Sequence, residues 1–428
     1  MVITVTTLSA QEKPVQWDLT NCIDYALKNN IQIQKSKISL EQSAIDTKTA
    51  KAKLFPNLTG SVSQSYTNRP LLVNSGTANS YAGSYAINSS MLLFDGGKTS
   101  KNIEQQKLTE EASKYSVLES EKSIQMSILQ SYLQVLYANE SVKINKATLD
   151  VATYQQNRGK ELFKAGSISK ADLAQLESQT SSDNYQYVVS QNTLSTYKLQ
   201  LKQLLELAVN EDMDIKIPEL NSLDVLKPLS SLQSIYEKAL SVMPQMKSSK
   251  LNVQIAGLET QKAKAGYLPK ISLNASIGTS NGSGTGWSLS NQLKNGVNEG
   301  IGVSMSIPIF SNRENKLAVE KARLSEKTVQ LELQNSEKAL LKEIESVFQD
   351  ALTAQSQYIA ALEKEKALKT SYELVEQQFQ LGMKNTLELL TEKNNLLAAQ
   401  QSLIQSKYMS IMNSQLLNLY QDYPIEIK

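Results

Sequence analysis

The residues that could carry out chemistry are few in this 428-residue chain. It contains no histidine, which removes the commonest general base and the commonest metal ligand. Its one cysteine, Cys22, excludes an internal disulfide and a cysteine cluster for zinc, and its apolar helical neighbours indicate a buried structural thiol. Residues 97–99 (GKT) follow a strand pattern and open a helix, as a phosphate-binding loop does, but that motif needs a glycine where Leu92 stands. We therefore expect no enzyme, no cofactor and no metal site.

The composition is that of a chain built from long, narrow helices. Lys plus Arg number 44 and Asp plus Glu number 42, so the net charge of +2 gives no reason to expect a nucleic-acid partner. Only 40% of the residues are hydrophobic and 20% are charged, which suits helices that each bury a narrow stripe. The sequence has no run of about 18 apolar residues, so we expect no membrane-spanning helix.

The first residues resemble the end of an export signal. Leu8-Ser9-Ala10 before Gln11 is typical of a secretory cleavage site, so we interpret residues 1–16 as a residual signal or N-terminal extension. The alternative is a disordered N-terminus. Gln11 stands where a lipoprotein would need a cysteine, so we expect no N-terminal lipid anchor.

Most of the chain consists of one unit that occurs twice. Residues 50–58 (AKAKLFPNL) recur as residues 263–271 (AKAGYLPKI), which places Pro56 on Pro269 at a shift of 213 residues. Beyond the strands that follow, the shift is 216 and places Gly166 on Gly382. We predict a first repeat over residues 17–208, a linker over 209–230 and a second repeat over 231–428. Each repeat opens with a helix, expected over 18–53 in the first, that breaks at the proline and turns into a strand.

Each repeat also holds two strands with an unusual polar face. Alternating apolar and small polar residues predict β-hairpins over 57–94 and 271–310, with Ser, Thr, Asn and Gly on one face and no charge inside the strands. Strands of about 9–11 residues can cross a bilayer, and a small polar face suits a water-filled lumen. The alternative is a soluble hairpin with one face on a core. Such a hairpin usually carries Lys, Glu and Arg on its wet face, so we favour membrane strands.

A very long helix follows each hairpin. Neither proline nor glycine interrupts residues 98–158, and Ile128, Val135 and Val142 recur every seven residues, as in a coiled-coil seam. We predict a helix over 98–163, a turn near 166 and a return helix over 170–207. The second repeat predicts a helix over 313–381, a turn near 382 and a return helix over 386–420. At 1.5 Å per residue, each long helix is on the order of 100 Å in length.

Four membrane strands cannot form a closed structure alone. Open sheet edges are not tolerated in lipid, and the smallest closed bacterial barrels use about eight strands. The chain must therefore oligomerise around a common axis. Three copies would supply twelve strands, but the residues alone give the need for closure and not the number of copies.

The order and spacing of these motifs resemble the TolC-type outer-membrane efflux protein family. The resemblance rests on residues 50–58 and 263–271, on the strand ends at 93–97 (LFDGG) and 308–312 (PIFSN), and on the turns at 163–173 (FKAGSISKADL) and 379–389 (FQLGMKNTLEL). Each motif alone is loose, but together they span residues 18–420. The resemblance implies a homotrimer with a twelve-stranded transmembrane β-barrel that continues as an α-helical periplasmic barrel.

The same resemblance implies a function and a location. Such proteins are exit channels of tripartite efflux pumps or type I secretion systems in the outer membrane of Gram-negative bacteria. They passively conduct small molecules, such as drugs and toxic compounds, or polypeptides. The implied partners are outer-membrane lipid, a periplasmic adaptor (membrane fusion) protein and an inner-membrane transporter of the RND, ABC or MFS class. The rival hypothesis is an exported structural or adhesive coiled-coil surface protein without a pore.

The resemblance also implies where the periplasmic aperture lies. Family members narrow just past the hairpin turns, and the family's aromatic, basic and acidic positions fall on Phe379, Lys384 and Glu388, with a matching acid at Asp172. An Asp172–Lys384 pair would hold the tip closed, although Phe379 lacks the hydroxyl of the family's frequent tyrosine. A further acid of the family falls on Thr391, which leaves Glu388 as the expected cation-attracting ring. The alternative for each charged residue is a solvated helix face.

The turns and the two prolines are expected to have structural roles. Tight reversals at Gly166 and Gly382 need a residue that tolerates a positive φ. Exposed tips are where an adaptor would dock, and here they consist of Gly166, Ser167, Gly382 and Met383. Pro56 and Pro269 would mark the transition from the helical barrel to the β-barrel.

Overall fold

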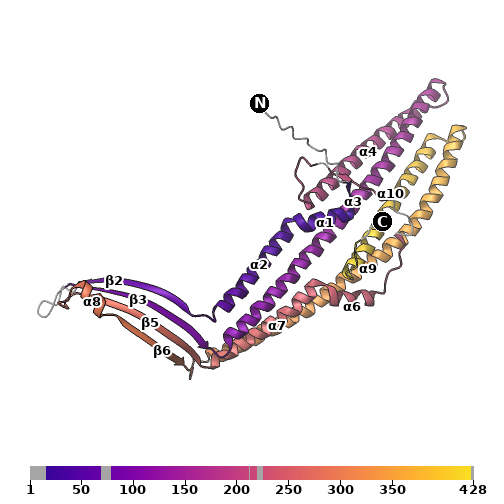
Figure 1. The fold of residues 1–428 in the computed structure, drawn as a ribbon. Coiled ribbons are helices and arrows are strands. Elements are labelled where there is room, and N and C mark those ends of the chain that lie inside the picture. Colours follow the sequence, from indigo (N-terminus) through magenta and orange to yellow (C-terminus); the bar gives the residue numbers. More distant parts are fainter. Residues whose placement is uncertain (1–15, 69–78, 212, 219–224, 426–428) are drawn as a thin grey trace, which may run out of the picture. The chain divides into compact units, whose positions relative to one another are not determined.

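The computed structural model describes residues 16–68, 79–211, 213–218 and 225–425 (Figure 1). The expected signal remnant, most of the loop after the first strand and part of the linker lie outside these residues. The chain divides into two compact units. The helical unit lies within Met1–Lys37, Ser116–Met246 and Ser336–Lys428, and the sheet unit lies within Ile38–Tyr115 and Lys247–Asn335. Each unit takes segments from both sequence repeats.

The sheet unit contains one antiparallel sheet in the order β2-β3-β5-β6 (Figure 1). Its strands are β2 (Asn57–Asn68), β3 (Asn79–Phe94), β5 (Lys270–Gly282) and β6 (Asn298–Ser306). Ile87 of β3 pairs with Ile277 of β5, so the hairpins of the two repeats join edge to edge. The join leaves β2 and β6 as the edge strands of the described sheet.

Both hairpins begin directly after a proline. α2 (Ile31–Ala52) ends just before Pro56, and β2 starts at the next residue. In the second repeat, α7 (Pro244–Lys264) continues as the short 3-10 helix η1 (Ala265–Tyr267), and Pro269 immediately precedes β5. Proline lacks the backbone N–H that would continue a helix, and it is tolerated at the start of a strand. The structure therefore places both prolines at the helix-to-strand changes.

Two pairs of long helices follow the same plan. α3 (Lys98–Lys164) and α9 (Glu314–Gln380) have 67 residues each, and the return helices α4 (Lys170–Leu204) and α10 (Thr386–Tyr420) have 35 each. α3, α9 and α10 match their predicted bounds to within one residue, and α4 ends at Leu204, three residues before its predicted end. The equal lengths within each pair agree with a duplicated unit. Among the described helices, none combines the length and the apolarity needed to cross a bilayer.

The first helix of each repeat differs from its prediction. The helix expected over residues 18–53 is two helices, α1 (Leu19–Asn29) and α2, separated by Asn30 in an extended conformation. The Asn30 side-chain oxygen accepts a bond from Gln32 N at 2.9 Å, as an N-cap does, and its amide donates to Leu204 O at 3.2 Å. The second repeat breaks between α6 (Leu232–Val242) and α7 at Met243, which is 213 residues after Asn30.

Two further features were not predicted. β1 (Gln16–Trp17) pairs in parallel with β4 (Asp214–Ile215), which ties the start of the first repeat to the linker. α8 (Leu289–Asn295) lies between β5 and β6, inside the segment predicted as the hairpin 271–310. Ser288 caps α8, because its Oγ accepts a bond from Asn291 N at 3.3 Å.

The helical unit has two cores at equivalent positions of the repeats. Cys22 and Ile128 are fully buried in the first core, and Ile235 and Ile344 are fully buried in the second. Ile235 is 213 residues after Cys22 and Ile344 is 216 residues after Ile128, so the cysteine fills the place of an isoleucine. Burial raises the pKa of the Cys22 thiol to about 12, as expected of an unreactive structural thiol.

Candidate functional site

One face of the sheet exposes its large apolar side chains. The strand register places Leu58, Val62, Ile87, Ile301 and Val303 on this face. Leu58 is 75% exposed and Ile301 is 79% exposed. A sheet in water normally buries such a face against a core, whereas hydrocarbon is a suitable solvent for it.

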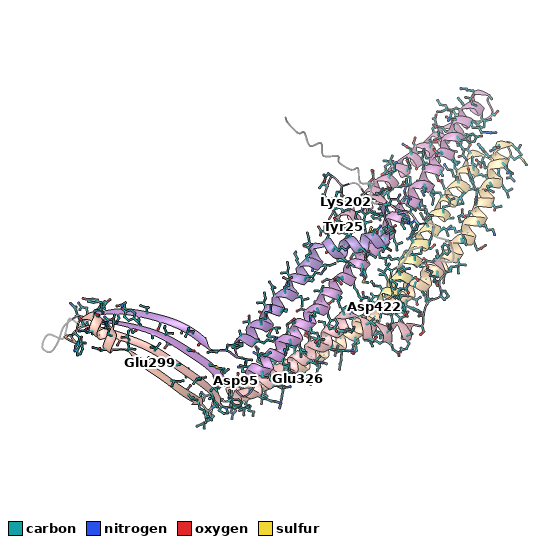
Figure 2. All side chains as sticks on the ribbon, viewed as in Figure 1. Tyr25, Asp95, Lys202, Glu299, Glu326 and Asp422 are labelled. Atoms are coloured by element: carbon teal, nitrogen blue, oxygen red, sulfur yellow. The ribbon has the colours of Figure 1, made fainter. Side chains whose placement is uncertain are left out.

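The opposite face carries small polar side chains that bond to one another across strands. Asn57 Oδ1 accepts a bond from Ser90 Oγ at 2.9 Å, and Asn274 Nδ2 donates to Ser304 Oγ at 3.2 Å. Charged residues of the described strands occur only at strand ends, as Glu299 does at the start of β6 (Figure 2). The sheet is therefore apolar on one side and neutral but polar on the other.

Aromatic side chains lie at both ends of the sheet. Tyr66 pairs with Tyr81 near the end where β2 and β3 are connected. At the other end, Phe55 precedes β2 and Phe310 follows β6, and both rings are exposed. The eight steps from Leu58 to Tyr66, at a rise of about 3.3 Å each, span about 26 Å. Outer-membrane strands have an apolar band of about 25 Å between aromatic girdles.

The helical hairpins reverse through two copies of one turn. Gly166 N donates to Phe163 O at 2.9 Å, and Ser167 N donates to Leu162 O at 2.8 Å; the same pair of bonds recurs at Gly382. This is the Schellman arrangement, in which the glycine takes a left-handed conformation. The φ angles are +72° at Gly166 and +75° at Gly382. These are the positive φ angles that were predicted for the reversals, and they explain why glycine stands at both positions.

Each return helix begins with a capping box. Asp172 N donates to Ser169 Oγ at 3.1 Å, and Ser169 N donates to Asp172 Oδ2 at 3.1 Å. Asn385 and Glu388 make the same reciprocal bonds at 2.9 Å and 3.1 Å. The backbone at the start of the helix therefore holds both acids in place at the tips.

Lys384 contacts the acid of its own hairpin. Its Nζ lies 2.5 Å from Glu388 Oε1, whereas Asp172 accepts a 2.6 Å bond from Ser169 Oγ. The Ser169 bonds are the main reason that the pKa of Asp172 is lowered, and the Thr386 hydroxyl of the other hairpin lowers it further. The Lys384 bond is the main reason that the pKa of Glu388 is lowered. The Asp172–Lys384 pair is not formed within the described chain, and its formation between chains stays a prediction.

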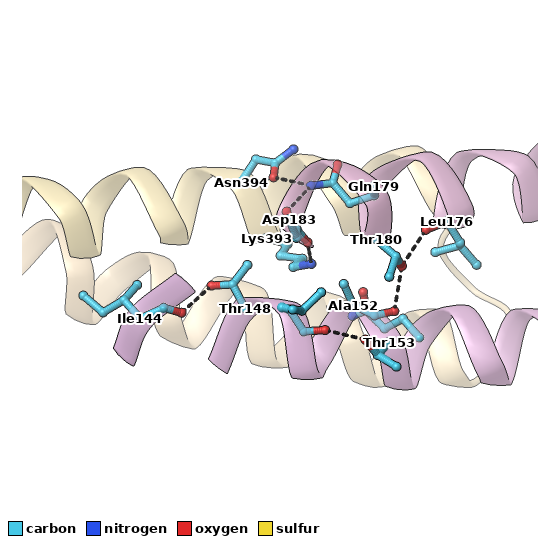
Figure 3. Close-up of polar contacts among 12 residues, drawn as sticks. Ile144, Thr148, Ala152, Thr153, Leu176, Gln179, Thr180, Asp183, Lys393 and Asn394 are labelled. Atoms are coloured by element: carbon cyan, nitrogen blue, oxygen red, sulfur yellow. Dashed lines mark hydrogen bonds and ion pairs between the residues drawn. The ribbon is translucent and has the colours of Figure 1, made fainter. Parts of the chain in front are cut away.

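A buried ion pair joins the two hairpins and was not found from the sequence. Lys393 Nζ of α10 lies 2.5 Å from Asp183 Oδ2 of α4, and both side chains are only 5% exposed (Figure 3). Gln179 Nε2 donates to Asp183 Oδ1 at 2.8 Å and to Asn394 Oδ1 at 3.3 Å, so it links the pair to a second residue of α10. Burial lowers the pKa of Lys393, and the bond to Asp183 partly opposes this shift.

Further polar contacts join the hairpins along their length. Gln155 Nε2 of α3 donates to the buried Tyr372 hydroxyl of α9 at 3.0 Å, and Lys407 of α10 lies 3.2 Å from Glu140 of α3. The hairpins thus contact each other through several polar links as well as through apolar side chains. Among these links, the Asp183–Lys393 pair is the most deeply buried charged contact.

The signature of the family described as "Outer membrane efflux protein" matches residues 22–206 and 235–420. The chain belongs to this family. A curated relative is the outer membrane efflux protein BepC of Brucella suis, 21% identical over 406 residues that cover 92% of this chain and 83% of BepC. The outer membrane protein TolC of Escherichia coli is also 21% identical, over 407 residues that cover 92% of this chain and 80% of TolC.

The fold of this efflux protein agrees with solved channel structures. A structure of CusC superposes with a TM-score of 0.84 over 97% of this chain and 96% of CusC, at 19% identity. The protein is a TolC-like outer-membrane efflux channel of bacteria, and members of this family transport rather than catalyse. Such channels typically trimerise and work in tripartite efflux or secretion systems. The alternative of an adhesive coiled-coil protein without a pore is therefore wrong.

The other predicted tip residues of the efflux protein are placed as follows. Phe379 is half-buried near the end of α9. Thr391 is exposed, and its hydroxyl donates to Leu387 O at 2.8 Å, so it brings no charge to the tip. Four tip residues are exposed: Gly166, Ser167, Gly382 and Met383.

Proposed function

We propose that three copies of this chain close a twelve-stranded barrel in the outer membrane and a helical tunnel in the periplasm. The observation that supports this is the four-stranded sheet with two open edges, β2 and β6, and an exposed apolar face. Open edges are costly in lipid, so β2 of one copy pairs with β6 of the next until the ring closes. Three sheets of four strands fall within the known sizes of outer-membrane barrels.

The pore is a passive duct with a neutral wall in its membrane part. Most of the lumen-facing residues are Ser, Thr, Asn and Gly, and none of those between the strand ends is charged. A neutral polar wall conducts small molecules and extended polypeptides alike, so the barrel itself selects little. Selection and energy come from a periplasmic adaptor and an inner-membrane transporter of the RND, ABC or MFS class.

A pair of neighbouring residues on β6 gives a sharp test of this arrangement. Val303 is on the apolar face and Ser304 is on the polar face. Val303→Lys should prevent membrane assembly, because a lysine at the lipid face costs about 2–4 kcal/mol per copy near the midplane. Ser304→Lys should assemble normally and shift the ion preference of the pore toward anions.

The measurements are the mass of the detergent-purified protein and its conductance in a planar bilayer. A trimer mass with pore conductance is expected for the unchanged chain and for Ser304→Lys. A water-soluble monomer without conductance would refute the channel assembly. Equal behaviour of the two lysine variants would refute the assignment of the faces.

At the periplasmic end, the proposed aperture is formed by Asp172, Lys384 and Glu388 from all three copies. Asp172 and Lys384 pair between copies in the closed state, and the acids form a cation-attracting ring. Asp172→Ala and Lys384→Ala should each raise closed-state conductance. Because Asp172 also caps α4, Ser169→Ala is the matched control: it removes the cap and keeps the charge. Unchanged conductance in both test variants would remove this pair from the gate.

The hairpin tips are the proposed docking site for the adaptor. Around the second turn, Leu381, Met383 and Leu387 are exposed apolar residues. An adaptor that covers them would gain their burial, roughly 1.5–3 kcal/mol for each large side chain. Cys22 is the sole cysteine and is buried, so Met383→Cys introduces one reactive thiol for crosslinking to the adaptor. A cysteine in place of the exposed Tyr154, away from the tip, is the control and should not crosslink.

A further inference from the structure

The connection between β5 and β6 is a fixed element rather than an open loop. Gln292 of α8 holds it in two ways: its Oε1 accepts a bond from Gly282 N at 2.7 Å, and its Nε2 donates to Trp287 O at 2.8 Å. Thr279 Oγ1 of β5 donates to Leu293 O at 2.8 Å. Two of these bonds tie α8 to the last residues of β5, and the third holds Trp287 against α8 within the connection. Figure 1 shows α8 beside the end of the sheet.

The contact with Thr279 defines the face of the sheet on which α8 lies. Side chains alternate along a strand, so Thr279 shares a face with Ile277 and Ala275. That face is the exposed apolar one, because Ala275 pairs with Ile301. The C-terminal half of α8, which Thr279 contacts at Leu293, therefore lies over the apolar face and not over the polar face.

The segment lies at the level of the aromatic end of the sheet. Ser283 N donates to Tyr81 O at 2.7 Å, and Tyr81 pairs with Tyr66. Around α8, Trp287 is 59% exposed, and Leu289 and Val297 are also more than half exposed. The α8 segment, residues 287–297, thus adds a tryptophan and two aliphatic side chains to a row of tyrosines.

We propose that the α8 segment binds the lipid of the outer leaflet and fixes the depth and tilt of the channel in the membrane. Tryptophan and tyrosine favour the interface between headgroups and hydrocarbon, where Trp287 continues the tyrosine row. The exposed Lys294 brings a positive charge to the same level, where lipid phosphates lie. The apolar face below it is the lipid-facing face of the barrel, so the segment extends an interface that this membrane protein already has.

This inference rests on the membrane location of the channel and not on its conductance. It predicts that α8 lies outside the barrel, against lipid. The competing arrangement places the segment over the pore mouth, in water. The two arrangements differ in what surrounds Trp287.

The chain has two tryptophans, so Trp287 can be observed by itself. Trp17 belongs to the helical unit, where its ring packs edge-on against Tyr25 with centroids 5.2 Å apart. Trp17→Phe keeps an aromatic ring there and leaves Trp287 as the sole tryptophan. If Trp17→Phe fails to assemble, the fluorescence of Trp287 can be obtained by subtracting the emission spectrum of Trp287→Tyr from that of the unchanged chain.

The assembled channel would be reconstituted in vesicles of phosphatidylglycerol and a phosphatidylcholine brominated on the acyl chain near the headgroup. Trp287 should emit at a shorter wavelength than tryptophan in water, and shallow bromine should remove most of its emission. Bromine near the chain end should quench it less. Lys294→Glu should weaken the shallow quenching, because anionic headgroups would repel the segment.

A matched control places a tryptophan on a surface that the inference keeps in water. Val209 of the helical unit is 98% exposed, so the triple variant Trp17→Phe, Trp287→Tyr, Val209→Trp should show quenching by aqueous iodide and none by brominated lipid. The same iodide-only behaviour for Trp287 in the conducting channel would overturn the inference and leave the channel function intact. Lipid quenching of Trp287 in a protein without conductance would refute the channel function alone.

Discussion

The buried Asp183–Lys393 pair leads to a prediction with an unusual pattern. With an effective dielectric constant of about 20, opposite charges 2.5 Å apart attract by about 7 kcal/mol. The removal of each ion from water costs several kcal/mol, so the net contribution of the intact pair is small. Removal of one partner leaves the other charge buried without compensation, and that costs about 3–5 kcal/mol.

Asp183→Leu and Lys393→Met should therefore each destabilise the contact between α4 and α10 by about 3–5 kcal/mol, because both sites are almost fully buried. The double variant should be close to the unchanged protein, since it removes both charges and fills the space with apolar atoms. Its effect should be far below the sum of the single effects, which is the signature of a coupled pair.

Hydrogen exchange measured by mass spectrometry would test this on the assembled channel. Peptides over residues 176–190 and 386–400 should exchange roughly 10²- to 4 × 10³-fold faster in each single variant, since about 1.4 kcal/mol corresponds to a factor of ten. The double variant should restore slow exchange. Lys164→Met, which removes an exposed pair with Glu161, should change nothing in these peptides. A double variant that exchanges as fast as the singles would refute the reasoning.

Three further predictions concern the tips and the core. The pKa values of Asp172 and Glu388 are lowered, so both carboxylates should keep their capping bonds at and above the ordinary carboxyl pKa range. The bonds should be lost as the pH falls through the lowered pKa values. Hydrogen exchange of the tip amides should therefore become faster, relative to the rest of the chain, only in acid. Gly382→Ala should lower the free energy of unfolding by about 1–2 kcal/mol, because φ is +75° at this residue. Gly257→Ala within α7 should leave the stability unchanged or raise it, since a Cβ there meets no neighbour closer than ordinary van der Waals contact. Thermal unfolding of the two variants measures the difference. Cys22 should react with Ellman's reagent at pH 8 only after denaturation, because its pKa is about 12.

The regular parts of the fold could be predicted because they follow from local sequence. The long helices contain no proline and only one glycine, Gly159, and the glycines at their ends take the positive φ of the turn, so their bounds were correct to within one residue. The break at Asn30 was missed because an asparagine inside a helical pattern is only a weak signal. Its position depends on a tertiary contact, the bond from Asn30 to Leu204 O.

The tip acids were predicted from the family resemblance, and the structure gives each a local role as a capping residue. The buried pair was not predicted because its partners lie on different helices. A single sequence does not show which sides of two helices pack against each other. The duplication did hold a clue. At the shift of 216, Asp183 falls on Ala399, a small apolar residue, and the structure shows that this position is buried in both repeats. The identity of Lys393 as its partner required the structure.

The contacts between the hairpins differ in strength along the helices, and this difference constrains how the tips can open. Lys384 and Glu388 are only half-buried, with side chains 36% and 41% exposed, and both tip acids keep their backbone bonds whichever partner Lys384 takes. An exchange of partners there therefore costs far less than at a buried pair. The Asp183–Lys393 pair is buried, and its separation would strand two charges. We therefore expect α4 and α10 to stay joined at this pair while the tips beyond it rearrange, so that opening begins at the turns and does not require the hairpins to separate.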